Sequence, residues 1–101
     1  MIKHIESQEE FAEVIKGDKV LVDFYADWCG PCKMLGPVLE ELGKELGDKV
    51  TIVKVNVDQQ EAIAAQYGIF SIPTLFIFER GVVARKQVGF VPKSGLIRFI
   101  A

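Results

Sequence analysis

Cysteine and histidine are scarce in this chain, and their scarcity limits the chemistry that it can perform. The 101 residues include two cysteines, Cys29 and Cys32, and one histidine, His4. A zinc site needs about four ligands, so too few soft ligands remain for one, and we expect no metal. Attachment of a c-type haem would require histidine directly after the second cysteine, where the chain has Lys33.

A strong charge imbalance and long apolar segments are also absent. The 12 basic and 14 acidic side chains give a net charge of −2, which indicates neither a nucleic-acid patch nor an acidic tail. No apolar run approaches the roughly 20 residues needed to span a bilayer. The first residues contain no apolar stretch typical of a signal peptide. We therefore expect a cytoplasmic protein with no nucleic-acid and no membrane partner.

What is present is the composition of one ordinary globular domain. The chain is 50% hydrophobic and 26% charged. No repeat, low-complexity tract or linker interrupts it, so we expect a single domain over residues 1–101. A chain of this length buries roughly two-thirds of the surface that its unfolded state exposes, which allows one core without metal or disulfide.

Periodicity predicts alternating strands and helices along this domain. Ser7 and Glu10 form a capping-box pattern that opens a first helix, which ends at 17–18. A second helix runs from the cysteines to residue 46. Further helices are expected at 59–67 and 93–101, and strands at 2–5, 19–26, 51–57, 74–78 and 82–88. This order predicts an α/β fold, with a central mixed sheet of about five strands flanked on both faces by four helices.

Both cysteines lie where a predicted strand gives way to a predicted helix, in the segment Trp28-Cys29-Gly30-Pro31-Cys32. Their i and i+3 spacing places the Cβ atoms about 5–6 Å apart, and slight tightening reaches the roughly 3.5–4.5 Å of a disulfide. A cross-link over so short a loop stabilises a protein by only about 2 kcal/mol. The pair is therefore a poor staple, and we interpret it as a reactive site.

The helix start gives the two cysteines different environments. Unpaired N–H groups and the helix dipole favour a thiolate at Cys29, and the thiolate is the reactive species. Pro31 suits the first turn, because an N–H group there would be unpaired anyway. Cys32 lies one turn into the helix and should be more buried. We therefore expect Cys29 to attack a partner disulfide and Cys32 to resolve the mixed disulfide.

Three segments resemble the thioredoxin family, and in order and spacing the resemblance extends over essentially the whole chain. They are residues 22–33, Ile72-Pro73-Thr74 and Val88-Gly89. The resemblance implies the thioredoxin fold and a dithiol–disulfide oxidoreductase that reduces protein disulfides through Cys29 and Cys32. It implies no cofactor besides this redox-active disulfide, and a monomer. The implied partners are protein disulfide substrates and a thioredoxin reductase, either NADPH- or ferredoxin-linked.

Asp23 interrupts an apolar strand between Val22 and Phe24. A strand aspartate is ordinarily an edge or end residue, but burial here would raise its pKa and suit a proton acceptor near neutral pH. The resemblance implies that Asp23 lies beneath the cysteines and helps to deprotonate Cys32. It also implies that Lys54, on the adjacent strand, influences the Asp23 carboxylate.

Pro73 precedes a predicted strand, where a proline without an N–H group is tolerated in any case. The resemblance implies more, namely a cis peptide bond between Ile72 and Pro73 that packs against the cysteine segment. The Ile72 backbone could then pair with an extended substrate segment as an added strand. Trp28 by residue type could be core, but its place before the reactive turn favours a partly exposed cover. The surface implied for substrates consists of Trp28, Gly30, Pro31, Ile72, Pro73, Val88, Gly89 and Phe90.

Three aromatic residues depart from the family pattern. Tyr25 stands where many members have tryptophan, and it adds a hydroxyl group that needs a partner. Phe70 occupies a position that is often polar or basic, and Phe90 one that is often small. Together Phe70 and Phe90 would enlarge an apolar rim around the site and shift partner preference.

Other interpretations of the cysteine pair stay open on the sequence alone. The cysteines could be inert core residues, or incidental to a binding module in a larger complex. They could also serve an oxidant or isomerase of an oxidising compartment, although the missing signal peptide and the Gly30-Pro31 pair disfavour this. In a reducing compartment a Cys-x-x-Cys pair favours catalysis or metal binding over a scaffold bridge.

Overall fold

The computed structural model describes residues 2–101, and its elements follow the predicted order. Each predicted helix and strand is present, with ends that differ by a few residues. A short 3-10 helix, Gly47–Lys49, was not predicted. The strands are β1 (Ile2–His4), β2 (Val20–Tyr25), β3 (Thr51–Asn56), β4 (Thr74–Glu79) and β5 (Val82–Val88), and the helices are α1 (Gln8–Val14), α2 (Gly30–Leu46), α3 (Glu61–Gln66) and α4 (Lys93–Ile100).

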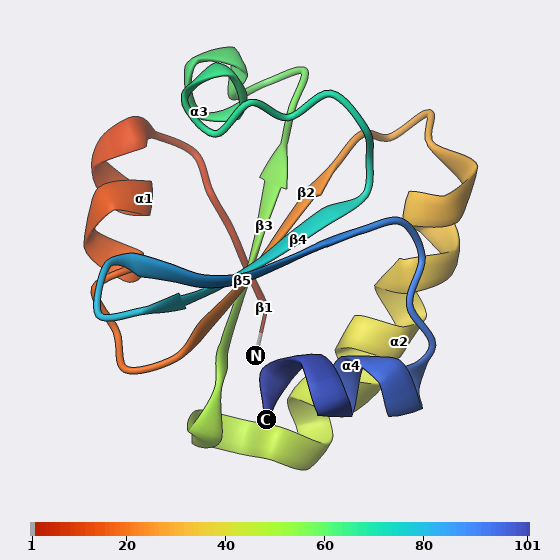
Figure 1. Ribbon diagram of the computed structural model, residues 1–101. Helices are drawn as coiled ribbons and strands as arrows, with labels where there is room; N and C mark the ends of the chain where they lie inside the picture. The colour runs from red at the N-terminus through yellow and green to blue at the C-terminus, as the bar shows by residue number, and fades with distance from the viewer. Residues whose placement is uncertain (1) are drawn as a thin grey trace.

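The five strands form one sheet in the order β1-β3-β2-β4-β5. β1, β3 and β2 run parallel, whereas β4 and β5 are antiparallel to their neighbours. The predicted mixed sheet is therefore confirmed, and β2 lies at its centre (Figure 1). β2 is paired on both sides, and because helices also cover both faces of the sheet, its residues 20–24 are buried.

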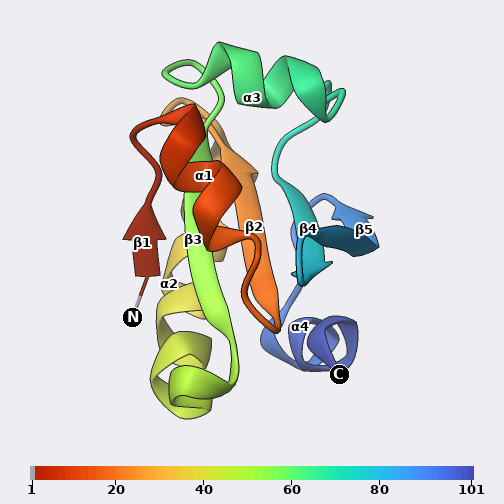
Figure 2. The ribbon, with the colours of Figure 1, turned by 90° about the vertical axis from the view of Figure 1, so that its left-hand side faces the viewer.

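Helices cover both faces of the sheet, and strand alternation gives each face its own core (Figures 1 and 2). On the first face, Val22 and Phe24 of β2 pack with Phe11 of α1 and Ile63 of α3. On the second face, Leu21 packs with side chains of α2 and α4. Successive strand residues point to opposite faces, so Asp23 and Tyr25 lie on the second face with Leu21.

The cap of α1 shows why the local sequence specifies this helix. Ser7 Oγ accepts a hydrogen bond from the Glu10 N–H group at 3.1 Å, as the capping-box pattern predicts. The Glu10 carboxylate accepts from Glu6 N at 2.7 Å, one residue before the expected Ser7 donor. The N-cap itself remains, because Ser7 Oγ satisfies the Glu10 N–H group, one of the donors that the first helical turn leaves unpaired.

The turn between β4 and β5 sets the register of the last hairpin. Arg80 and Gly81 both have left-handed backbones, with φ of 50° and 85°. Gly81 adopts this conformation without steric cost, which suits a tight turn between the two strands. Within residues 2–101 no helix is both long enough and apolar enough to cross a bilayer.

Candidate active site

The cysteine pair lies at the junction between β2 and α2. Cys29 is the N-cap of α2, and a disulfide joins it to Cys32 with a Cα–Cα distance of 5.2 Å. The Cys32 N–H group donates to Cys29 Sγ at 3.2 Å. A thiolate at Cys29 would therefore receive a backbone hydrogen bond and the positive end of the helix dipole.

The two sulfurs have different neighbours, although both cysteines are buried. The exposed fraction is 5% for Cys29 and 3% for Cys32, so the expected difference in burial is slight. Cys29 Sγ lies 3.7 Å from the carbonyl oxygen of Ile72. In the disulfide this is a contact only, since the sulfur carries no proton. Cys32 instead lines a pocket of about 300 Å³, together with Lys54.

The segment before β4 packs against the cysteines. The peptide bond between Ile72 and Pro73 is cis, which confirms the prediction from the family resemblance. Ile72 packs on the cluster formed by the two cysteines and Ala26. The Gly89 N–H group donates to the Pro73 carbonyl at 2.8 Å, and Gly89 has a left-handed φ of 96° that favours glycine. This hydrogen bond attaches the loop after β5 to the Ile72-Pro73 segment.

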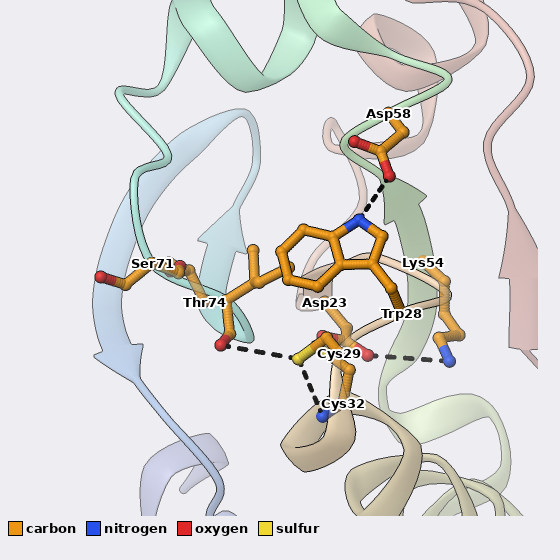
Figure 3. Close-up of a disulfide and its surroundings, with 9 residues drawn as sticks. Asp23, Trp28, Cys29, Cys32, Lys54, Asp58, Ser71 and Thr74 are labelled. Carbon is orange, nitrogen blue, oxygen red and sulfur yellow. Dashed lines mark hydrogen bonds and ion pairs between the residues drawn. A yellow bond between two sulfur atoms is a disulfide. The ribbon is translucent and has the colours of Figure 1, made fainter.

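Asp23 is fully buried on the second face of the sheet, so of the two positions left open by the sequence, the buried one is present and the edge or end position is excluded. Burial raises the pKa of the Asp23 carboxyl from 3.8 to about 6, and the Lys54 ammonium acts in the opposite direction. Lys54 Nζ lies 3.8 Å from Asp23 Oδ2 (Figure 3). Among the described residues, neither carboxylate oxygen has a hydrogen-bond partner. The carboxylate can therefore accept a proton without first losing a donor.

Trp28 covers the site from the solvent side, with 70% of its surface exposed. Its indole N–H group donates to Asp58 Oδ2 at 2.8 Å (Figure 3). Asn56 in turn accepts a hydrogen bond from the Asp58 N–H group at 2.9 Å. Asp58 and Asn56 were not predicted as site residues. Two polar residues at the end of β3, its last residue Asn56 and the following Asp58, were the available signal, because the ends of parallel strands meet at one edge of a sheet.

Part of the surface expected for substrates is exposed. Gly30 and Pro31 are exposed in the first turn of α2, whereas Ile72 and Gly89 are half-buried and Pro73 is buried. Val88 is 50% exposed and Phe90 39%, at the end of β5 and just after it. Phe70, two residues before Ile72, is 96% exposed and packs on nothing. Within residues 2–101 no group of three or more His, Cys, Asp or Glu side chains is placed to hold a metal ion.

Comparison with known proteins covers nearly the entire chain. The family model described as Thioredoxin matches residues 2–101. Thioredoxin of Bacillus subtilis is 49% identical over 90 residues, which is 89% of this chain and 86% of the relative. Thioredoxin of Haemophilus influenzae is 48% identical over 100 residues, or 98% and 94% of the two chains.

Solved structures of thioredoxins also match the fold of this chain over nearly its full length. Thioredoxin of Malassezia sympodialis superposes with a TM-score of 0.90 at 40% identity, covering 100% of this chain and 92% of the other. The five-stranded mixed sheet and four helices therefore form the thioredoxin fold. The cysteine pair stands at the start of α2 and forms a disulfide there, as a dithiol–disulfide oxidoreductase requires. This chain belongs to the thioredoxin family.

Proposed function

We propose that the chain reduces disulfide bonds of other proteins, with Cys29 as the nucleophile and Cys32 as the resolving cysteine. The asymmetry between the two sulfurs carries this proposal. Cys29 caps α2 and lies against the Ile72 carbonyl, whereas Cys32 lines the pocket that Lys54 shares. The surroundings of Cys29 support the attack on the substrate, and those of Cys32 support the later resolution.

The reaction transfers two electrons in two exchanges of sulfur. The Cys29 thiolate attacks one sulfur of the substrate disulfide, whose S–S bond breaks as the Cys29–substrate bond forms. The departing substrate thiolate takes up a proton. Cys32, once deprotonated, attacks Cys29 Sγ and releases the second substrate thiolate. The substrate disulfide is then reduced, and the Cys29–Cys32 disulfide is formed.

Asp23 is proposed to accept the proton of Cys32 in the second exchange. With a pKa of about 6, its carboxyl is mostly ionised near neutral pH, yet basic enough to take up a proton. Lys54 is proposed to stabilise the ionised form from 3.8 Å. Asp23 thus acts on resolution rather than on the first attack.

Substrates are proposed to bind as an extended segment beside Ile72. Trp28, Val88 and Phe90 supply exposed apolar surface, and the backbone of Ile72 offers polar groups for an added strand. Gly30, Pro31 and Gly89 complete this surface without bulky side chains, with the buried Pro73 next to Ile72. Phe70 extends the apolar rim and is proposed to favour substrates with apolar residues near their disulfide.

The remaining roles follow from family membership. Thioredoxin family proteins act on disulfide substrates. For this chain we propose a thioredoxin reductase as the electron donor, linked to NADPH or ferredoxin. We also propose that it works in the cytoplasm as a monomer, as one domain over residues 1–101, and without a bound cofactor.

Reduction of insulin disulfides tests the proposal. With NADPH and thioredoxin reductase, or with the ferredoxin-linked enzyme, the chain should reduce insulin catalytically, and Cys29→Ser should abolish the activity. No reduction with either reductase would contradict the proposal. A reduction potential well above that of the glutathione pool would indicate an oxidant or isomerase instead.

A further inference from the structure

We infer that Tyr25 is a positioning residue for the proton acceptor, because its ring holds the Lys54 ammonium next to the Asp23 carboxylate. This inference rests on the proposed roles of Asp23 and Cys32. It concerns a residue that the family resemblance distinguished only as a replacement for tryptophan.

The contacts of the Lys54 ammonium carry this inference. Lys54 Nζ lies 4.3 Å from the centroid of the Tyr25 ring and 3.8 Å from Asp23 Oδ2. Asp23 and Tyr25 are two residues apart in β2 and share a face of the sheet, and Lys54 is the partner of Asp23 in the β2–β3 register. A cation within about 6 Å of a ring centroid is attracted by the ring quadrupole. The ammonium is therefore held between a carboxylate and an aromatic face.

The contact with the Tyr25 ring matters because the ion pair between Lys54 and Asp23 exists only while Asp23 is ionised. At 3.8 Å the ammonium and carboxylate attract each other without a close hydrogen bond, and this attraction ends when Asp23 takes up a proton. The pocket beside Lys54 opens a path to water for a long and flexible side chain. The ring attracts the ammonium in either protonation state of Asp23. It therefore keeps Lys54 in place through the proton transfer.

Each neighbouring element presents its own groups to this site. His4 of β1 has Nδ1 3.5 Å from the Tyr25 hydroxyl, which gives that hydroxyl a partner on the side away from Asp23. Asp27 follows β2, and Cys32 and Lys33 of α2 line the same pocket as Tyr25. β4 places Leu75, which has no charge, beside Asp23. Lys54 is therefore the cation nearest to the carboxylate among the described residues, and its position decides how far ionised Asp23 is stabilised.

The test compares Tyr25→Leu, which removes the ring, with Tyr25→Phe, which keeps the ring and loses only the hydroxyl. The pKa of Asp23 is measured by carboxyl-carbon NMR, and the rate of mixed-disulfide resolution is measured against pH in single turnovers. Tyr25→Leu should raise the Asp23 pKa by about half to one pH unit and move the midpoint of the rate profile upward equally. Tyr25→Phe should leave both near the wild-type values.

A double-mutant cycle with Lys54→Met excludes a general effect of packing. In the Lys54→Met background, Tyr25→Leu should no longer change the Asp23 pKa, because no ammonium remains to be held. An unchanged pKa in Tyr25→Leu, or an equal change with and without Lys54, would overturn the inference. Tyr25→Met serves the same comparison should Tyr25→Leu fail to fold. Because the pKa is measured without substrate, a negative result here is distinct from failure of insulin reduction by the wild-type protein.

Discussion

At the scale of single residues, Asp23 shows best that the environment of a side chain can depend on how the whole sheet is paired. Its place within an apolar run was visible in the sequence, but an edge position and a buried position were both compatible with it. The pairing of β2 with β3 and β4 on its two sides settles this, and such long-range pairing cannot be read from neighbouring residues. Trp28 was uncertain for the same reason, since the hydrogen-bond partner of its indole is Asp58, 30 residues away and beyond β3.

Replacement of Asp23 by asparagine should stabilise the protein above pH 6. The pKa of Asp23 is raised by burial from 3.8 to about 6, so its protonated form is favoured by folding. Stability from this group is then fully present below about pH 4 and is lost as the pH rises through about 6. Ionisation of the buried Asp23 thus lowers the free energy of unfolding by roughly 3 kcal/mol at high pH. Burial of the asparagine amide has a cost of its own, which offsets part of this difference. We expect Asp23→Asn to be more stable by about 1–3 kcal/mol at pH 7.

Urea unfolding at several pH values measures this difference. The gap in the free energy of unfolding between Asp23→Asn and wild type should be smallest near pH 4 and grow up to pH 7. Other groups contribute equally to both proteins. Glu10, for instance, has a pKa lowered first by the Glu6 N–H group and then by Lys3, so its effect has the opposite sign and cancels in the comparison. A gap that does not vary with pH would contradict the raised pKa of Asp23.

At the scale of elements, the helices and strands that depend on interactions between residues close in sequence could be predicted from the sequence. The Ser7 and Glu10 capping pattern and the helical periodicity of α2 each predicted their element because propensity and tertiary packing agree there. The 3-10 helix Gly47–Lys49 was missed, since it has no periodicity of its own. The packing of a helix against its neighbours also depends on contacts that the spacing of apolar residues in the sequence does not specify.

Two glycines within helices illustrate this dependence on packing. A Cβ atom at Gly43 of α2 would make an ordinary contact, 3.5 Å from Ile52 Cδ1, whereas one at Gly95 of α4 would lie 2.6 Å from Val91 Cγ1. Gly43→Ala should therefore gain about 0.5–1 kcal/mol of stability through helix propensity. Gly95→Ala has the same propensity advantage but should lose about 1–2 kcal/mol, because the stiff and buried Val91 must move.

Thermal unfolding of the two alanine variants beside wild type checks the pair. The expected result is a higher midpoint for Gly43→Ala and a lower one for Gly95→Ala. If both midpoints rise, the contact at Val91 does not restrict α4, and propensity alone governs the two helices.

At the scale of the molecule, aromatic residues divide between a buried cluster and the exposed site. Phe78 is 1% exposed, and its ring packs edge-on against Tyr67 with centroids 5.6 Å apart. Phe70 is 96% exposed although it belongs to the same residue type. Composition and periodicity could not separate them, because Phe70 lies in a loop where no pattern fixes which way a side chain faces.

The two phenylalanines should respond oppositely to truncation. Phe78→Ala should cost about 3–5 kcal/mol of stability, as expected for loss of a large core side chain. Phe70→Ala should change stability by less than about 0.5 kcal/mol. It should instead lower kcat/KM for protein disulfides with apolar flanking residues several-fold, measured against an otherwise equal substrate with polar flanks. Equal losses for both substrates would show that the Phe70 ring does not discriminate between them.

Trapping of a covalent complex separates the roles of the two cysteines most directly. In Cys32→Ser the attack by Cys29 remains, but resolution is blocked, so a mixed disulfide with a protein substrate should accumulate. Intact mass spectrometry should give the sum of both chains, and peptide mapping should place the bond at Cys29. In Cys29→Ser the complex should be absent or far less abundant. A complex through Cys32 that forms as readily as the one through Cys29 would contradict the assignment of attack to Cys29 and resolution to Cys32.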